Sequence, residues 1–208
     1  MIKSISYDQS EIIQNILTLH VPSHQIDCDV TYSKGIFYKN TGIPDPEYKF
    51  DIKPIAPDVK FGDCRHLPLP NECFNCVMFD PPFLATTGQS LSQGINGNII
   101  TKRFGVYPNE HELHKFYTDS ISEIYRLLKE KGILIFKCQD KVSSGKQYMS
   151  HCYIYNEAIR IGFYPKDLFI LLAKNRVTAE WQINNQKNAR KFHCYFWVFQ
   201  KIDRTIKY

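Results

Sequence analysis

Residues 74–83 read FNCVMFDPPF, and this stretch indicates the fold class. Within it, residues 77–79 form a short apolar run of the kind that a parallel sheet buries on both faces, and the run stops abruptly at Asp80. Neither of the two prolines that follow has a backbone N–H, and both have a fixed φ. The stretch therefore predicts a buried strand that ends in a stiff, acidic corner.

Helix and strand patterns alternate along the chain on both sides of this strand. Apolar residues recur at helical spacing in three segments, and Gly132 and Gly162 stop the last two of them. The expected helices are 8–20, 110–131 and 150–161, and the expected strands are 26–30, 48–51, 74–79, 133–140, 168–173 and 191–201. Strands that alternate with helices predict an α/β fold, with a mostly parallel sheet and an antiparallel C-terminal strand.

Length and composition are typical of one intracellular domain. A chain of 208 residues that is 43% hydrophobic can bury one substantial core, so we expect a single domain over residues 1–208. The chain starts with polar residues, and no apolar run approaches the length of a membrane span. We therefore expect a soluble cytoplasmic protein with no membrane partner.

The seven cysteines are odd in number and scattered, which suits a reducing compartment better than a disulfide framework. Cys64, His66, Cys73 and Cys76 supply metal-ligand types within a short span, but Cys76 falls in the predicted strand and the sequence has no second paired knuckle. We predict no metal site, and we assign most of the cysteines to the core.

The formal net charge of +5 is unevenly distributed. Basic residues crowd the last third of the chain, at Lys174, Arg176, Lys187, Arg190, Lys191, Lys201, Arg204 and Lys207. Such a patch is typical of a nucleic-acid partner, but ordinary solvated surface residues explain it equally well.

Residues 84–108 fit no helix or strand pattern and directly follow the acidic corner. A connection longer than about 12–15 residues inside a compact domain is usually a functional loop or a disordered insertion. We favour a mobile loop that covers a site at the corner, with Lys102 and Arg103 contacting phosphate. No other segment is large enough for a separate target-recognition domain.

Acidic residues lie at the ends of successive predicted strands, at Asp29, Asp51 and Asp80, and Asp63 lies in the connection between the last two of these strands. Ligands bind outside the carboxyl ends of the strands in open α/β sheets, so these acids are the first candidates for a site. The Asp80 carboxylate and the Pro81 carbonyl are two acceptors that can face one exocyclic NH₂ group. Phe83 offers a flat face on which an extruded base can stack.

The motif DPPF at residues 80–83 resembles the catalytic motif of the amino-methyltransferases that transfer methyl from S-adenosylmethionine to the exocyclic amine of adenine in DNA. The stretch DVTYSKG, residues 29–35, lies where this family has its glycine-rich cofactor turn. LLKEKGILIFKCQD, residues 127–140, resembles the segment after the catalytic motif. The resemblance spans about residues 9–199 and implies a Rossmann-like methyltransferase fold with helices on both faces of the sheet.

The resemblance also implies roles for particular residues. Asp80, Pro81, Pro82 and Phe83 match the catalytic motif. The residues that match the binding segments for S-adenosylmethionine are Asp29 and Gly35 at the ends of the cofactor turn, Asp51 for the ribose hydroxyls, and Asp63 with Cys64 for the adenine amine. Aspartate at the first position of the motif implies adenine, since the cytosine enzymes of this class usually have serine there.

Two departures from the family leave alternatives open. The cofactor turn has a single glycine, Gly35, where the family has two or three, and recognition of a sequence must come from loops, from a second copy of the chain or from a specificity-giving partner. The alternatives are an amino-methyltransferase acting on adenine or guanine in ribosomal or transfer RNA, and a non-catalytic nucleic-acid-binding subunit.

The predicted contacts to nucleic acid, in DNA by preference, lie in three places. Lys102 and Arg103 belong to the covering loop, and Arg190 and Lys191 belong to the basic C-terminal third. Lys137 and Asp140 stand at the end of the strand after the DPPF motif, although Lys137 could equally serve to neutralise nearby acids.

Overall fold

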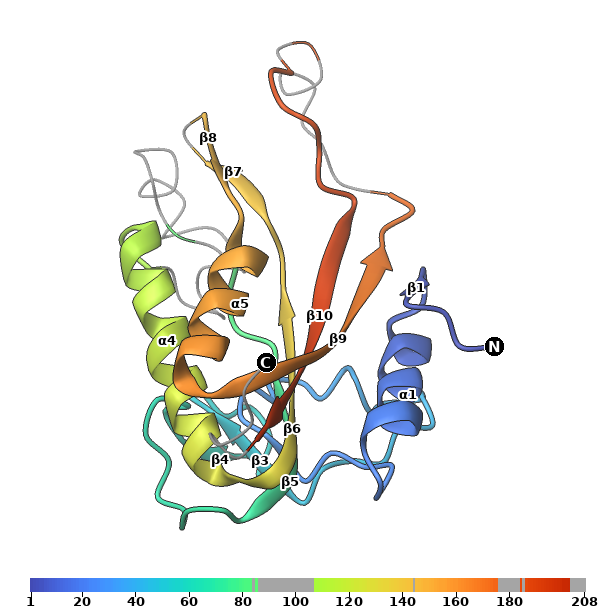
Figure 1. Ribbon diagram of the computed structural model, residues 1–208, viewed down its shortest axis with the longest axis vertical. Helices are drawn as coiled ribbons and strands as arrows, with labels where there is room; N and C mark the ends of the chain where they lie inside the picture. The colour runs from blue at the N-terminus through green and yellow to red at the C-terminus, as the bar shows by residue number, and fades with distance from the viewer. Residues whose placement is uncertain (84, 86–106, 144, 176–183, 185, 203–208) are drawn as a thin grey trace.

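The computed structural model describes residues 1–83, 85, 107–143, 145–175, 184 and 186–202. Its main sheet has eight strands in the order β1-β9-β10-β6-β5-β2-β3-β4 (Figure 1). These strands are β1 (Ile5–Ser6), β2 (Cys28–Asp29), β3 (Tyr48–Asp51), β4 (Lys60–Phe61), β5 (Phe74–Phe79), β6 (Leu128–Cys138), β9 (Phe163–Leu172) and β10 (His193–Lys201). A separate hairpin consists of β7 (Lys141–Ser143) and β8 (Lys146–Tyr148).

Strand directions confirm the predicted type of sheet. β10 runs antiparallel to both of its neighbours, β6 and β9, and all other neighbouring strands of the main sheet are parallel. After β2 the chain adds β3 and β4 on one side, and then returns to place β5 and β6 on the other side. The carboxyl ends of β2 and β5 therefore flank a topological switch point, which is where α/β sheets bind ligands.

Helices cover both faces of the sheet, as predicted. α1 (Gln9–His20) lies on one face, and α4 (Glu110–Leu127) and α5 (Ser150–Ile161) lie side by side on the other (Figure 1). Asp8 caps α1 by accepting a hydrogen bond from the Ser10 N–H at 2.8 Å, and Asn109 caps α4 by accepting one from the Glu112 N–H at 2.9 Å.

The buried strand β5 separates two core layers. Because side chains alternate along a strand, Val77 and Phe79 join the layer beneath α4 and α5, whereas Cys76 and Met78 join the layer beneath α1. All four side chains are 0% exposed. The continuous apolar run thus has the burial on both faces that its sequence predicts.

The helix predicted over 110–131 ends earlier, at Leu127. The N–H groups of Glu72 and Cys73 donate to the carbonyls of Arg126 and Leu127 at 2.9 and 2.8 Å, and Leu128 pairs with Phe74 in the sheet. Tertiary pairing therefore draws residues 128–131 into β6, although their sequence favours a helix.

The region around β2, β3 and β4 differs more from the expectation. The strand predicted over 26–30 is only two residues long, and β4 was not predicted at all. Residues 30–47 and 52–59, which are described throughout, fold into turns and bends, with no helix between β2 and β3 or between β3 and β4.

Candidate active site

The corner after β5 is tied to elements on both sides of it. The backbone N–H of Asp80 donates to Thr31 Oγ1 at 2.8 Å, which joins the corner to the turn after β2. The Tyr117 hydroxyl, on α4, donates to the Pro82 carbonyl at 2.8 Å. The corner is therefore stiff both because of its prolines and because of its tertiary hydrogen bonds.

The corner contains two acceptors, the Asp80 carboxylate and the Pro81 carbonyl. Lys137 Nζ lies 3.3 Å from Asp80 Oδ2, and the Asp80 side chain is 20% exposed. Within the described part of the chain, no other group donates to this carboxylate, and none donates to the Pro81 carbonyl. Burial raises the pKa of Asp80, while the Lys137 ammonium opposes that shift. Lys137 therefore favours the ionised form of Asp80.

Asp29, at the end of β2, is in the interior. Its side chain accepts hydrogen bonds from the Tyr38 hydroxyl at 2.7 Å and from the Thr31 N–H at 2.9 Å, and it is 1% exposed. Burial raises the pKa of Asp29 to about 7, against the lowering effect of these hydrogen bonds. This placement makes Asp29 a residue that shapes the turn rather than one that lines an open site.

Asp51, at the end of β3, connects the turn after β2 to the residues that follow β3. One carboxylate oxygen accepts a hydrogen bond from the Ser33 N–H at 3.0 Å, and the other accepts one from the Lys53 N–H at 2.7 Å. A carboxylate has about four lone-pair sites, so these two bonds leave capacity for further donors.

Gly35 lies against an aromatic ring of its own turn. Its φ is +63°, and a Cβ atom there would lie 2.4 Å from Tyr32 Oη. The Tyr32 ring stacks on Tyr38 with 5.5 Å between ring centroids, and its hydroxyl donates to Asp45 at 2.7 Å. Gly35 therefore makes room for the ring of Tyr32 within the turn.

Asp63 and Cys64 follow β4. Arg65 forms an ion pair with Asp63, with 2.6 Å between Nη2 and Oδ2, and these hydrogen bonds lower the pKa of Asp63. Cys64 is 6% exposed, its Sγ lies 3.4 Å from Ser120 Oγ on α4, and burial raises the pKa of its thiol to about 12. Asp63 remains accessible, whereas Cys64 is a protonated wall residue.

A hollow of about 220 Å³ opens between these segments. Five of the predicted site residues line it: Asp51, Asp63, Cys64, Asp80 and Pro82. Backbone and side chains of the turn, including Ser33 and Lys34, complete one wall, and Tyr107 and Phe116 contribute aromatic surface. Asp29 and Gly35 are not among its described lining residues. The structure thus brings three strand-end acids to one opening.

The predicted contacts to nucleic acid are placed unevenly. Lys102 and Arg103 lie outside the described residues. Lys137 pairs with Asp80, and its Nζ also lies 5.1 Å from the centroid of the Phe37 ring. Asp140 is 3% exposed and accepts a hydrogen bond from the His151 N–H near the start of α5, a position that suits helix capping better than contact with a target.

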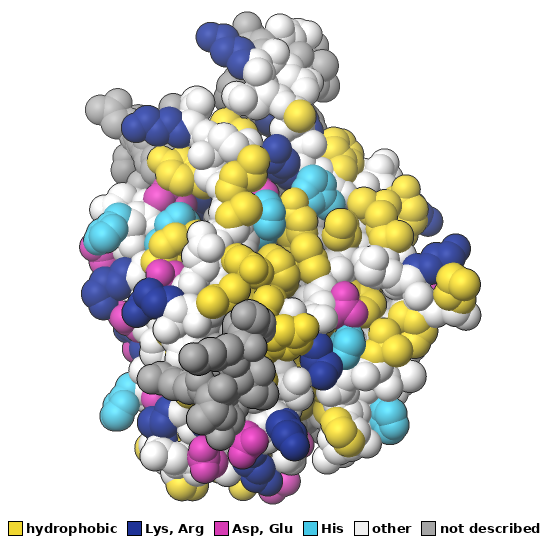
Figure 2. All heavy atoms as spheres, in the orientation of Figure 1, with side chains coloured by type: hydrophobic (Ala, Val, Ile, Leu, Met, Phe, Trp, Pro, Cys, Tyr) yellow, Lys and Arg dark blue, Asp and Glu magenta, His cyan; other side chains and the backbone are white. Residues whose placement is uncertain are grey.

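The described basic residues of the last third do not form one patch. Lys201 is 9% exposed and donates to the Leu128 carbonyl at 2.7 Å, at the opposite edge of the sheet from Asp80. Arg190 and Lys191 precede β10 at the edge where β6 and β9 end, which is also the edge of Asp80. Figure 2 shows Lys and Arg side chains at the end of the molecule where the β7–β8 hairpin and the start of β10 lie.

Several residues that build the site carry no signal that sequence reasoning could use. Thr31, Tyr38 and Tyr117 hold strand ends through hydroxyl groups, and ordinary core or turn residues have the same appearance in a sequence. Thr31 offers a weak signal, because a hydroxyl residue two positions after a strand-end acid often bonds back to it.

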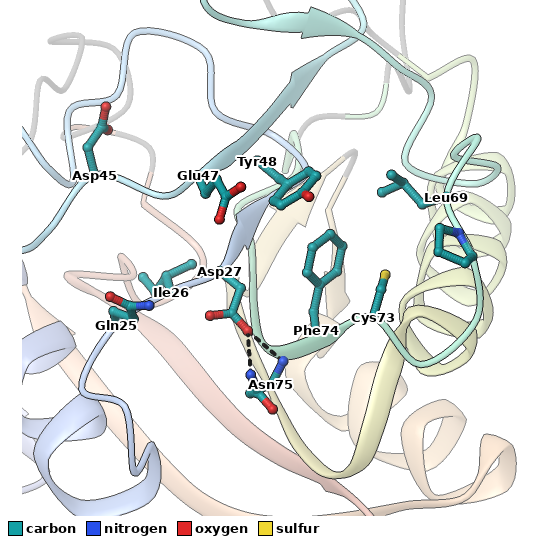
Figure 3. Close-up of a pocket in the computed structure, with 11 residues that line it drawn as sticks. Gln25, Ile26, Asp27, Asp45, Glu47, Tyr48, Leu69, Cys73, Phe74 and Asn75 are labelled. Carbon is teal, nitrogen blue, oxygen red and sulfur yellow. Dashed lines mark hydrogen bonds between the residues drawn. The ribbon is translucent and has the colours of Figure 1, made fainter.

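A second hollow lies at the opposite edge of the sheet, where β2, β3 and β5 begin (Figure 3). Its volume is about 510 Å³, and Tyr48 and Phe74 form an edge-to-face pair in its wall, with 5.0 Å between ring centroids. Asp27 accepts three hydrogen bonds there, from the N–H and the side chain of Asn75 and from the Cys76 N–H. This acid is engaged in holding the start of β5, and none of the predicted site residues is among the described residues that line the larger hollow.

No protein-family model matches the chain, and no curated protein matches its sequence. In the described part of the chain, no helix has both the length and the apolar character needed to cross a bilayer.

Solved structures match the fold. A protein from Galdieria sulphuraria, provisionally named a sarcosine dimethylglycine methyltransferase, matches with a TM-score of 0.55 and 12% identity, over 98% of this chain and 94% of that one. TrmN from Thermus thermophilus matches with a TM-score of 0.51 and 14% identity, over 95% of this chain and 50% of that one. These matches and the strand order show that the chain has a Rossmann-like methyltransferase fold.

A provisionally named DNA modification methylase, also from Thermus thermophilus and complexed with S-adenosyl-L-methionine, matches with a TM-score of 0.47 and 20% identity over 70% of this chain. Across three structures of that methylase, the chain spans 53–56% of the length of its counterpart.

Proposed function

We propose that this chain transfers a methyl group from S-adenosylmethionine to the exocyclic amine of adenine in DNA. One observation carries the proposal: at the end of β5, the Asp80 carboxylate lines a hollow that Asp51 and Asp63 also line, and the Pro81 carbonyl follows it in the DPPF corner. Two acceptors at one point suit an NH₂ group, which has two hydrogens to donate.

Asp80 and the Pro81 carbonyl prepare the amine for reaction. Accepting both of its hydrogens draws the nitrogen lone pair out of conjugation with the ring, so that the nitrogen becomes a nucleophile. The carboxylate also stabilises the positive charge that develops on the nitrogen, and it can take the proton that leaves. Lys137, at 3.3 Å, favours the ionised form of Asp80 against the effect of burial on its pKa.

The residues present fit S-adenosylmethionine, which when bound supplies an electrophilic methyl group and leaves as a neutral thioether. Asp51 has spare acceptor capacity for two ribose hydroxyls. The Asp63 side chain is 32% exposed, and an adenine amine would replace part of the four hydrogen bonds that Asp63 accepts from Arg65. Cys64 offers a neutral apolar wall beside Asp63. The proposal keeps residues 1–208 as one domain and keeps 84–108 as a cover over the site, although most of that segment lies outside the described residues.

A second candidate is a methyltransferase-like subunit that binds nucleic acid without catalysis. The packing of Tyr32 against Gly35 favours it, because the Tyr32 ring fills the space beside the single glycine of the turn. The intact Asp80 corner favours the enzyme.

Single-turnover transfer of labelled methyl tests the proposal. We expect label in adenine-containing DNA, single- or double-stranded, and none in matched DNA in which every adenine is replaced by purine, which lacks the amine. Label in matched RNA but not in DNA would favour the alternative of an RNA methyltransferase. Label in the amine of guanine would also favour that alternative. Titration calorimetry with S-adenosylmethionine distinguishes the enzyme from the non-catalytic subunit. Absence of binding, with and without nucleic acid, would exclude catalysis and leave the binding subunit.

A further inference from the structure

Lys141 is a buried cation that the proposed chemistry does not use. It is the first residue of β7, and its ammonium donates a hydrogen bond to the Phe83 carbonyl. The same ammonium lies 3.0 Å from Glu110 Oε1, at the first residue of α4. The two charged side chains are only 15% and 8% exposed.

Glu110 is what keeps a charged lysine tolerable at this position. Burial lowers the pKa of Lys141, and Glu110 opposes that shift. Glu110 in turn lies in the first turn of α4, where the helix dipole favours a negative charge. Within the described part of the chain, Lys141 is the only ion-pair partner of Glu110, and the contact lacks hydrogen-bond geometry at the carboxylate. The pair therefore fixes the lysine mainly through charge.

The contacts of Lys141 connect two places that are far apart in sequence. Phe83 ends the catalytic corner, and Glu110 begins the helix that follows residues 84–108. Ala85 and Tyr107 form a β-bridge beside them, so the chain closes on itself next to the corner. Lys141 reaches this closure from a third element, the β7–β8 hairpin.

We propose that Lys141, held by Glu110, is a positioning residue that fixes the backbone of Phe83 and thereby the aromatic face on which the target base stacks. The inference rests on the proposed function. The corner has two anchors in sequence, the Tyr117 hydroxyl on the Pro82 carbonyl and the Lys141 ammonium on the Phe83 carbonyl. They hold consecutive carbonyl groups, and among the described residues no group donates to that of Pro81, one residue earlier.

The test compares Lys141→Met with Lys146→Met, a matched control in the same hairpin whose lysine is exposed. Misplacement of a reacting group by about 1 Å can cost 10²-fold in rate, so we expect Lys141→Met to lower kcat by about 10- to 100-fold. The affinity for S-adenosylmethionine should stay unchanged, because Lys141 contacts none of the cofactor acids. Lys141→Arg, which keeps a charged donor, should recover most of kcat.

A double variant separates positioning from simple loss of charge balance. Lys141→Met leaves Glu110 buried without its cation, which is destabilising by itself. Adding Glu110→Gln removes that unpaired charge but does not restore the donor to Phe83. We expect the double variant to recover thermal stability while kcat stays low. Recovery of kcat together with stability would overturn the positioning role.

Amide hydrogen exchange gives a readout that does not need activity. In Lys141→Met, peptides spanning residues 79–85 should exchange faster than in the wild type and in Lys146→Met. Unchanged exchange, or an equal fall in kcat in both methionine variants, would overturn the inference. Faster exchange in a protein that methylates no nucleic acid would instead support the anchor and refute the proposed function.

Discussion

The strands on the two sides of β5 differ in length and in what covers them. β2, β3 and β4 are two to four residues long, and turns connect them. On the other side, β6, β9 and β10 are nine to eleven residues long, and α4 and α5 pack on them. The three acids that the resemblance implies for cofactor binding, Asp29, Asp51 and Asp63, belong to the short-strand half and its connections. Asp80 borders the long-strand half.

The short-strand half depends on side-chain bonds where the other half depends on backbone ladders and helices. Lys49 forms ion pairs with Asp45 and Asp58 across this region, and Asp45 also accepts the Tyr32 hydroxyl. In the other half, β6 and β10 pair over six residues and their apolar side chains are buried between helices. We call the short-strand half the cofactor half and the long-strand half the target half. Changes to single polar residues should therefore disturb the conformation of the cofactor half more than that of the target half.

The largest effect is expected at the boundary between the halves, in Asp80→Asn. The change keeps the shape of the side chain, but it removes the charge and turns one acceptor into a donor, which repels an NH₂ group. Loss of one such interaction costs about 10²–10³ in rate. Single-turnover methyl transfer measures it, with Asp119→Asn on the exposed face of α4 as the control.

Folding and cofactor affinity should survive Asp80→Asn, because its backbone bond to Thr31 and the acids Asp51 and Asp63 are untouched. Transfer at the wild-type rate would show that DPPF only terminates a strand here, and the enzymatic assignment would lose its main support.

The cofactor half should be most sensitive at Gly35. Gly35→Ala meets both a φ of +63° and a Cβ contact of 2.4 Å with Tyr32, so we expect a loss of about 2–5 kcal/mol in the free energy of unfolding. Gly145→Ala is the matched control, since its φ is +75° but no atom lies within 4 Å; it should lose only about 1–2 kcal/mol. Chemical denaturation measures both. Equal losses would mean that the Tyr32 packing contributes nothing.

The two halves also differ in how far the sequence predicts them. The apolar run of β5, the helical spacing of α5 and the alternation in β10 each reflect burial in regular structure, and the structure confirms all three. The C-terminal end of α4 was predicted four residues too late, because amides from the distant residues Glu72 and Cys73 cap it. Local propensity carries no information about such a partner.

In the cofactor half, the sequence identifies acids but not their partners. Asp51 was predicted from its position after a strand and Asp63 from the resemblance to the family, and both line the hollow. Asp29 was predicted in the same way but is engaged by Tyr38, nine residues further along the chain. A short strand followed by turns has no periodicity, so the pattern could not indicate which acid would face inward.

Asp51→Ala tests whether the cofactor half binds S-adenosylmethionine. Removing an ionised acceptor for two hydroxyls should weaken binding by about 1.5–3 kcal/mol in titration calorimetry. Asp51→Asn, which keeps an oxygen for the Ser33 N–H, should hold the turn and isolate the part of the loss that comes from charge. Unchanged affinity in both variants would place the cofactor elsewhere.

Asp29 predicts how stability depends on pH. Its pKa is raised from 3.8 to about 7 in the folded chain, so the folded state holds a proton that the unfolded state releases. Its contribution to stability is present below pH 3.8 and is lost as the pH rises through about 7. Relative to Asp29→Asn, the wild type should lose on the order of 2 kcal/mol between about pH 5.5 and 7.5.

Urea denaturation of wild type and Asp29→Asn at both pH values gives that difference directly. The comparison with the variant matters because burial lowers the pKa of His114 from 6.5, which shifts stability in the opposite direction over this pH range. Parallel pH profiles for the two proteins would show that Asp29 is ionised without penalty in the fold.

The smallest effect concerns the target half, at the residues before β10. If Arg190 and Lys191 contact phosphate, replacing both with glutamine reduces the counterions released on binding, and the log–log salt slope should fall by about one to two units. Affinity for nucleic acid should drop similarly for all sequences, and affinity for S-adenosylmethionine should not change.

Lys129→Gln with Lys131→Gln is the matched control, because these exposed residues lie at the opposite end of β6. Fluorescence anisotropy over a range of salt concentrations measures the slope. An equal decrease in both double variants would mean that net charge alone drives binding, and an unchanged slope would mean that the nucleic acid approaches from another side of the corner.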